Sequence, residues 1–111
     1  QNKVKESGAF TIMLGKDDVV YFYEGMDPAT EGNFRSASFK TIRDEIIRKK
    51  QSTKVDDLVI IIKPSEDATY KNTVDILDEM TISEIKRYAM VDVSPVEFQL
   101  VKITESAAGI K

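Results

Sequence analysis

The sequence predicts an α+β domain built on a single small sheet of about four strands. Three observations support this fold class. Short runs rich in β-branched and aromatic residues indicate strands. Two stretches with apolar residues at helical spacing separate these runs along the chain. The resulting order, β-β-α-β-α-β followed by a short C-terminal helix, is expected to place the helices on one face of the sheet.

A β-hairpin is predicted at the start of the domain. Residues 10–14 alternate in polarity as a half-buried strand does, and residues 19–24 form a second run of β-branched and aromatic side chains. Residues 15–18 between them are typical of a turn. The consecutive aromatic residues 21–23 must alternate between the two faces of the sheet, so an outward ring is a candidate anchor for a partner.

The next element is predicted to be a helix that ends near Gln51, after a loop over residues 25–35. Ser36 or Ser38 is expected to cap this helix. One helical face carries Phe39, Ile42, Ile46 and Ile47. The basic residues 48–50 are expected to be solvated beside the negative C-terminal pole of the helix.

Residues 58–93 are predicted to form a β-α-β unit with two parallel strands and a right-handed crossover. Residues 58–62 form a continuous apolar run, typical of a central strand covered on both faces. Asp67 or Thr69 is expected to cap the helix that follows. Its predicted buried stripe is Tyr70, Val74, Leu77 and Met80. Residues 87–93 are predicted to be the last strand, and its drier face carries Ala89, Val91 and Val93.

A capping box at residues 94–97 predicts the start of the terminal helix. Ser94 is expected at the N-cap, Pro95 at the first helical position and Glu97 at the third. The predicted apolar stripe of this helix is Val96, Leu100 and Ile103. The domain is therefore expected to span residues 9–104, with a loose N-terminal linker at 1–8 and a flexible tail at 105–111.

Composition excludes several classes of chemistry. The chain of 111 residues has no histidine and no cysteine, so it cannot build a Ser-His-Asp triad, a thiolate nucleophile or an HExxH zinc site. Its net charge of −3 argues against a nucleic-acid surface. Asp75, Asp78 and Glu79 share one helical side, where carboxylates can bind a metal ion or act as acid and base; a solvated face is favoured instead. No catalytic residue, metal ligand or cofactor is predicted.

No apolar run approaches the roughly 20 residues of a membrane helix. The chain also begins at Gln1, without a methionine. We therefore expect it to be the soluble part of a longer protein.

The order of several segments resembles the ExbD/TolR family of biopolymer transport proteins. The resemblance covers residues 10–93. It rests on the apolar run with Pro64 at residues 58–64, the helix at residues 70–78 that begins with Tyr70, and the strand at residues 88–92. The opening hairpin is similar to the first pair of strands in that family.

This resemblance implies a periplasmic domain of a single-pass inner-membrane protein. Family members form dimers within an ExbB-like pentameric channel subunit, and they convert proton flow into motion that is passed to a TonB-like partner. The proton-carrying carboxylate lies in the membrane helix, so no aspartate of this chain takes over that role. An ExbD-like role in outer-membrane transport is favoured, and a TolR-like role in envelope integrity with peptidoglycan contact is the alternative. A small carboxylate-based enzyme or ligand-binding domain is a third hypothesis.

We expect binding to use the edges of the sheet, because an edge strand offers unpaired main-chain groups to an extended peptide or to a second copy of the chain. The opening strand and the last strand are the predicted edges. The predicted partner-binding residues are Phe10, Thr11, Ile12, Met13, Leu14, Tyr88, Met90 and Asp92.

Overall fold

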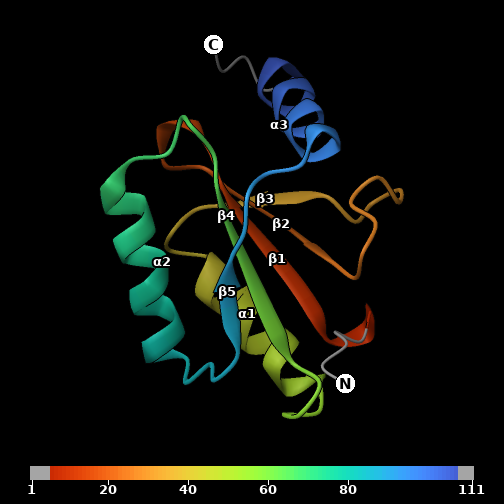
Figure 1. The fold of residues 1–111 in the computed structure, drawn as a ribbon, viewed down its shortest axis with the longest axis vertical. Helices are drawn as coiled ribbons and strands as arrows, with labels where there is room; N and C mark the ends of the chain where they lie inside the picture. The colour runs from red at the N-terminus through yellow and green to blue at the C-terminus, as the bar shows by residue number, and fades with distance from the viewer. Residues whose placement is uncertain (1–5, 108–111) are drawn as a thin grey trace.

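The molecule is an α+β fold with one mixed sheet of five strands in the order β3-β2-β1-β4-β5 (Figure 1). The computed structural model describes residues 6–107. The strands are β1 (Ala9–Leu14), β2 (Val20–Glu24), β3 (Arg35–Ala37), β4 (Val59–Pro64) and β5 (Tyr88–Met90). The helices are α1 (Ile42–Gln51), α2 (Tyr70–Ile82) and α3 (Pro95–Ala107). The predicted fold class is confirmed, with one strand more than expected.

The hairpin and the parallel pair are confirmed. β1 pairs with β2 in antiparallel fashion, and β4 pairs with β5 in parallel. The turn between β1 and β2 uses Asp17 and Asp18 at positive φ, a conformation that aspartate tolerates better than most residues. β4 is an inner strand, as its continuous apolar sequence predicts, because β1 lies parallel along its other side.

The additional strand, β3, lies where the sequence predicts the end of a loop and a helix cap. It pairs with the outer side of β2 over Arg35, Ser36 and Ala37. Its residues are small or charged, so they carry no strand signal of their own. The guanidinium of Arg35 lies 4.7 Å from the ring centre of Phe22, and this contact holds β3 against its neighbour.

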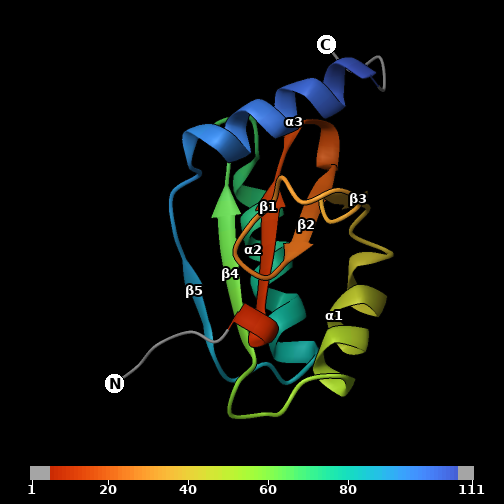
Figure 2. The ribbon, with the colours of Figure 1, turned by 90° about the vertical axis from the view of Figure 1, so that its right-hand side faces the viewer.

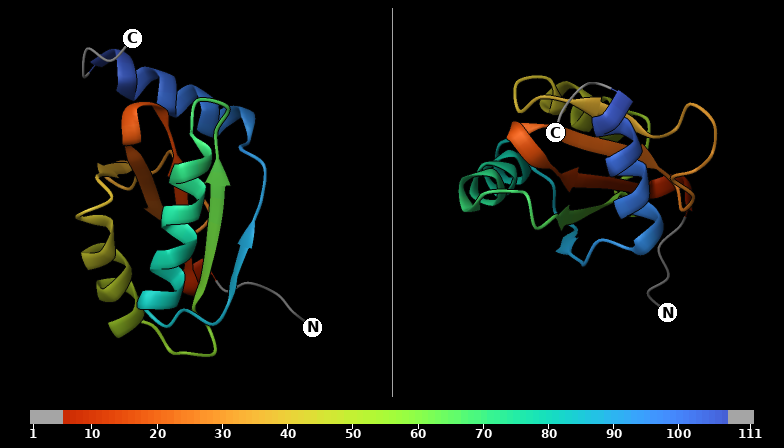
Figure 3. Two further views of the ribbon diagram at one scale, coloured as in Figure 1. Left: turned by 90° about the vertical axis from the view of Figure 1, so that its left-hand side faces the viewer. Right: turned by 90° about the horizontal axis from the view of Figure 1, so that it is seen from above.

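The main core lies between the sheet and helices α1 and α2, which cover the same face (Figure 3). Alternate residues of each inner strand point to this face, because successive side chains of a strand point to opposite sides. The buried strand residues of this core are Phe10, Ile12, Leu14, Val20, Phe22, Ile60 and Ile62. Helix α1 contributes Ile42 and Ile46 as predicted, whereas Ile47 is 37% exposed.

The predicted cap of α2 is confirmed, whereas that of α1 is wrong, because its N-cap is Thr41, which makes no side-chain capping hydrogen bond. The hydroxyl of Ser38 accepts hydrogen bonds from the backbone N–H groups of Lys40 and Thr41 in the turn that leads into α1. Thr69, and not Asp67, is the N-cap of α2. Its hydroxyl accepts a hydrogen bond from the Asn72 N–H, and the Asn72 side chain accepts one from the Thr69 N–H, which completes a capping box.

The predicted buried stripe of α2 is wrong in part. Tyr70 is 84% exposed and Val74 is 37% exposed, while Met80 is fully buried. The buried residues of the helix are Asn72, Ile76, Glu79 and Met80. The buried face of α2 is thus rotated relative to the predicted one. Asn72 and Glu79 can be buried because their polar groups form hydrogen bonds inside the fold.

Helix α3 crosses one end of the sheet on the face opposite to α1 and α2 (Figure 2). It packs through Val101 against Met13, Tyr21 and Tyr23. The predicted stripe is wrong, since Val96 is 53% exposed and Ile103 is 65% exposed. The buried residues of this helix are Glu97, Val101 and Glu105. The helix also continues past the predicted boundary at residue 104 to Ala107, and residues 108–111 of the predicted tail, like residues 1–5 of the predicted linker, lie outside the described residues.

The aromatic residues of β2 are all buried, so the predicted outward ring does not exist. Phe22 lies in the core under the two helices. Tyr21 and Tyr23 point to the other face, where the Phe34 ring stacks on the Tyr21 ring at 5.5 Å between ring centres. The loop before β3 thus helps α3 to cover this face.

We predict that Ile76→Ala lowers the free energy of unfolding by about 2–5 kcal/mol, because it opens a cavity in the core under α2. Chemical denaturation measures this loss. The matched control is Ile82→Ala on the same helix, where the side chain is 54% exposed, and its effect is expected to stay within about 0.5 kcal/mol. Equal losses in the two variants would contradict this placement of α2.

Candidate functional site

The outer side of β5 is the candidate binding edge. The Ile60 N–H donates to the Arg87 carbonyl at 3.0 Å, and the Val91 N–H donates to the Ile62 carbonyl at 2.9 Å. Residues 87, 89 and 91 therefore bond inward to β4. Because the ladder alternates, the main-chain groups of Tyr88 and Met90 point outward. Within residues 6–107 no strand lies beyond β5.

The side chains along this edge are also accessible. Tyr88 is 44% exposed and Met90 is 49% exposed. Asp92 follows two residues after Met90 and is exposed as well. The predicted dry face of this strand is wrong, since Ala89 and Val91 are exposed as well. The structure thus brings the predicted residues Tyr88, Met90 and Asp92 together on one edge.

The other predicted edge is wrong. β1 is the middle strand of the sheet, paired with β2 on one side and with β4 on the other. All of its residues are buried, including the predicted partner-binding residues Phe10, Thr11, Ile12, Met13 and Leu14. Their main-chain groups are already used in the two ladders, so β1 cannot accept an added strand.

A buried ionic cluster fixes α3 next to this edge, and we call it the Glu97 cluster: Tyr23, Lys63, Ser94 and Glu97. Glu97 is 1% exposed, and its carboxylate accepts hydrogen bonds from the Lys63 ammonium at 2.8 and 2.9 Å. It also accepts from the Tyr23 hydroxyl at 2.5 Å and from the Ser94 N–H at 2.7 Å. The Ser94 hydroxyl accepts from the Glu97 N–H, so the predicted capping box is confirmed.

The cluster shifts the pKa values of its members in opposite directions. Burial raises the pKa of Glu97, but the hydrogen bonds from Lys63, Tyr23 and Ser94 outweigh it and hold this pKa below its ordinary value. Burial and the hydrogen bond to Glu97 raise the pKa of Tyr23 to about 12. Glu97 is therefore a carboxylate and Tyr23 a neutral donor at neutral pH, which suits a structural clamp and leaves no group ready for proton transfer.

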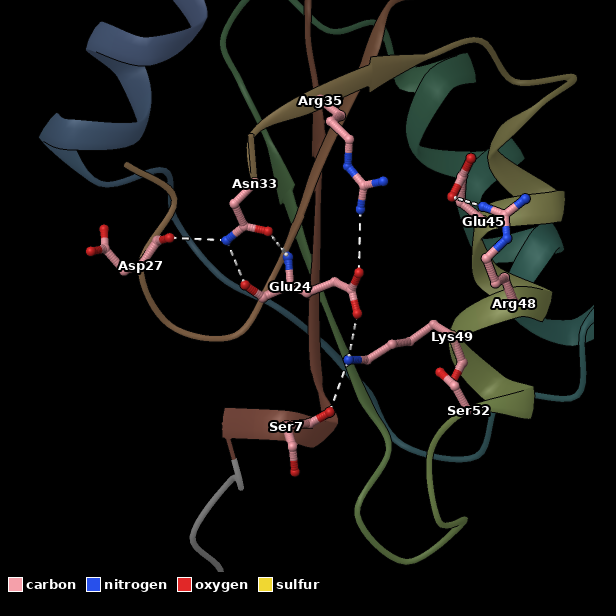
Figure 4. Close-up of polar contacts among 9 residues, drawn as sticks. All are labelled: Ser7, Glu24, Asp27, Asn33, Arg35, Glu45, Arg48, Lys49 and Ser52. Atoms are coloured by element: carbon pink, nitrogen blue, oxygen red, sulfur yellow. Dashed lines mark hydrogen bonds and ion pairs between the residues drawn. The ribbon is translucent and has the colours of Figure 1, made fainter. Parts of the chain in front are cut away.

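A second polar cluster lies at the opposite end of the sheet (Figure 4). Arg35 and Lys49 both point at the Glu24 carboxylate, at 3.2 and 2.9 Å. Lys49 also donates to the Ser7 carbonyl at 2.8 Å, so it ties α1 to the chain that leads into β1. The hydrogen bond from Lys49 lowers the pKa of Glu24. Lys49 is only 6% exposed, which corrects the expected solvation for this residue, whereas Arg48 is exposed as expected.

The acidic residues of α2 do not converge on a site. Asp75 pairs with Lys71 at 2.7 Å on the surface. Glu79 is buried, which corrects its predicted place on a solvated face, and it accepts two hydrogen bonds from the Arg43 guanidinium at 2.8 and 2.9 Å. This bidentate pair joins α2 to α1. Among the described residues, no group of three or more acidic side chains is placed to hold a metal ion.

None of the helices in the described part of the chain has the length and apolar character needed to cross a membrane. Comparison of the chain with models of known protein families finds no match, and comparison with curated proteins finds none either.

Sequence reasoning missed the Glu97 cluster, although one signal for it was available. Lys63 directly follows the apolar run of β4. Because successive side chains of a strand point to opposite faces, it lies on the face opposite to Ile60 and Ile62. A lysine that points to a partly covered face needs an anionic partner. The sequence alone does not show that this partner is Glu97, 34 residues further along.

We predict that Glu97→Gln lowers the free energy of unfolding by about 3 kcal/mol at neutral pH, because the Lys63 ammonium loses its buried counter-charge. Thermal and chemical denaturation measure this loss. The control is Asp67→Asn, which removes an exposed ion pair between Lys102 of α3 and the loop before α2. Its cost is expected to be at most about 1 kcal/mol, and a similar cost for Glu97→Gln would contradict the role of the cluster.

We also predict that the difference in stability between the native protein and Glu97→Gln narrows in acid. The pKa of Glu97 is lower in the folded protein than in the unfolded chain, so its contribution is complete above the ordinary glutamate range and is lost as pH falls through the folded value. Denaturation curves recorded between about pH 7 and pH 2 test this. A difference that does not change with pH would count against it.

Proposed function

We propose that this domain is a binding module of a proton-motive-force-driven energy-transduction subunit of the ExbD/TolR type. In this proposal the domain lies in the periplasm, and an ExbD-like role is favoured, with force relayed to a TonB-like partner for outer-membrane transport. The order of the elements supports the proposal, because the opening hairpin, the inner strand that ends at Pro64, the helix that begins at Tyr70 and a last strand agree with the resemblance in the sequence.

The observation that carries the proposal is the open edge of β5. The outward main-chain groups of Tyr88 and Met90 are in the position that an added strand requires, and their side chains are about half exposed. An edge of this kind recognises an extended partner through main-chain hydrogen bonds, with little demand on its sequence.

The sheet also provides a direct path for force. β4 lies between β1 and β5 and is parallel to both, so a pull that enters at the start of β1 reaches β5 through two parallel ladders. A pull along the strands loads the hydrogen bonds of each ladder together instead of one after another. Lys49 strengthens the entry point, since its ammonium holds the Ser7 carbonyl just before β1.

Three glutamates that an enzyme could use as acid or base are engaged in structural pairs in this fold. Glu97, Glu79 and Glu24 each bind one or two cations that join different elements. This distribution favours a binding module over a carboxylate-based enzyme. The proposed partners are an ExbB-like channel subunit, a TonB-like protein and a second copy of the chain, all in the context of the longer membrane-anchored protein.

We predict that Met90→Pro weakens binding of a TonB-type periplasmic peptide by about tenfold, because proline removes an outward N–H and blocks the approach of an added strand. Isothermal titration calorimetry measures the affinity. The fold is expected to persist, since the Met90 N–H points away from β4. Met90→Ala is the matched control and is expected to retain most of the affinity.

Backbone NMR of the isotope-labelled domain shows where the peptide binds. Shifts at residues 87–92 support the edge, and shifts confined to the faces of α1 and α2 would refute it. A pull-down with purified peptidoglycan separates the two family roles. Retention on peptidoglycan without peptide binding would favour the TolR-like role.

A further inference from the structure

A pocket lies where the β5 edge ends. Three segments form its walls: the loop after β4, the connection from β5 to α3, and the first turn of α3. Its lining includes Pro64, Ser65, Glu66, Val93, Pro95 and Phe98, and its volume is about 370 Å³. A second hollow, bordered by Pro64, Met90, Val91 and Asp92, meets it at Pro64. The two hollows are therefore neighbours, one bordering the open edge and the other lined by Phe98.

The walls of this pocket suit a large apolar side chain. Two prolines, a valine and a phenylalanine supply most of the surface, and the volume lies in the range of sites that enclose a ring system. Phe98 is 44% exposed, and the Lys102 ammonium lies 5.2 Å from its ring centre. Lys102 is itself paired with Asp67 at 3.0 Å. The ring is thus held from one side and open toward the pocket on the other.

The pocket and the neighbouring hollow each carry a negative charge that the fold does not neutralise. Glu66 and Asp92 are both exposed, and among the described residues neither has a cationic partner. Asp67, next to Glu66, differs because Lys102 neutralises it. One carboxylate at the apolar pocket and another at the neighbouring hollow favour a ligand with a basic group beside its apolar one.

A second copy of the chain would not fill this pocket. If two β5 strands paired antiparallel about Ala89, residues 83–86 of the second copy would lie nearest to the pocket. The apolar residue of that segment, Ile85, is 6% exposed and packs in its own core. The pocket would therefore stay empty in such a dimer, and a separate extended segment is the better occupant.

We infer that this pocket is a specificity subsite for a partner peptide that adds to β5, and that it accepts an aromatic side chain with a lysine or arginine next to it in the peptide. This inference rests on the proposed function and deepens it. Main-chain pairing along Tyr88 and Met90 supplies the alignment, the apolar walls bind the ring, and Glu66 and Asp92 attract the basic neighbour.

The test uses three synthetic peptides of about eight residues, enough to span β5 and reach the pocket at ~3.3 Å per residue. Each alternates valine and threonine along the pairing region. The first ends in tryptophan and lysine, the second has alanine for the tryptophan, and the third has glutamate for the lysine. NMR titration of the labelled domain, with residues 88–98 as reporters, gives both affinity and position.

The first peptide is expected to bind about tenfold more tightly than the second and several-fold more tightly than the third at low salt. Phe98→Ala is expected to abolish the preference for tryptophan. Ile103→Ala, an exposed position on the same helix away from the pocket, is the control and should leave the preference unchanged.

The outcomes separate the subsite from the proposed function. Equal affinity of the first two peptides, with shifts at Tyr88 and Met90, would overturn the subsite and leave the edge intact. Absence of shifts at β5 with all three peptides would overturn both. Shifts at the pocket that depend on protein concentration alone would show that a second copy occupies it, and they would also overturn the inference.

Discussion

The parallel pairing of β1 with β4 is the constraint on which the rest of the structure depends. It places the start of the domain in the middle of the sheet, so the hairpin partner β2 must extend outward on one side and β5 on the other. It also aligns Phe10 with Ile60 and Ile12 with Ile62 on the face that α1 and α2 cover. The same pairing therefore determines the core, the two edges and the shortest path between the N-terminal strand and β5.

The two edges of the sheet differ in what they offer. β3 is held by charged contacts, since Arg35 lies over Phe22 and pairs with Glu24. A short strand with a charged side chain discourages further pairing. β5 has a tyrosine and a methionine on its open side and leads directly into an apolar pocket. This asymmetry favours one edge as the binding site and protects the other.

Local signals made much of the fold predictable. The hairpin, the inner apolar strand, a cap at Asp67 or Thr69 and the capping box at Ser94 depend on residues close in sequence, and the sequence predicts each of them. β3 was missed because three small or charged residues carry no strand signal. The position of β1 was missed because strand order depends on pairing with residues about 50 positions away, which alternation of polarity does not encode. The candidate site was therefore half predicted: the residues on β5 were found, and the pocket beside them was not.

The prediction of a buried apolar stripe on α3 is wrong for the same reason, since local patterns do not show contacts with residues distant in sequence. Val96 and Ile103 were expected in the core because burial of apolar side chains is the usual driving force. The Glu97 cluster reverses this expectation, since a carboxylate that accepts four hydrogen bonds no longer opposes burial. By fixing the first turn of α3, the cluster also sets the position of Phe98, which forms one wall of the pocket. A buried ionic contact thus shapes the apolar pocket beside the edge, and removing its charge is expected to disturb the pocket before it disturbs the pairing of β5 with β4.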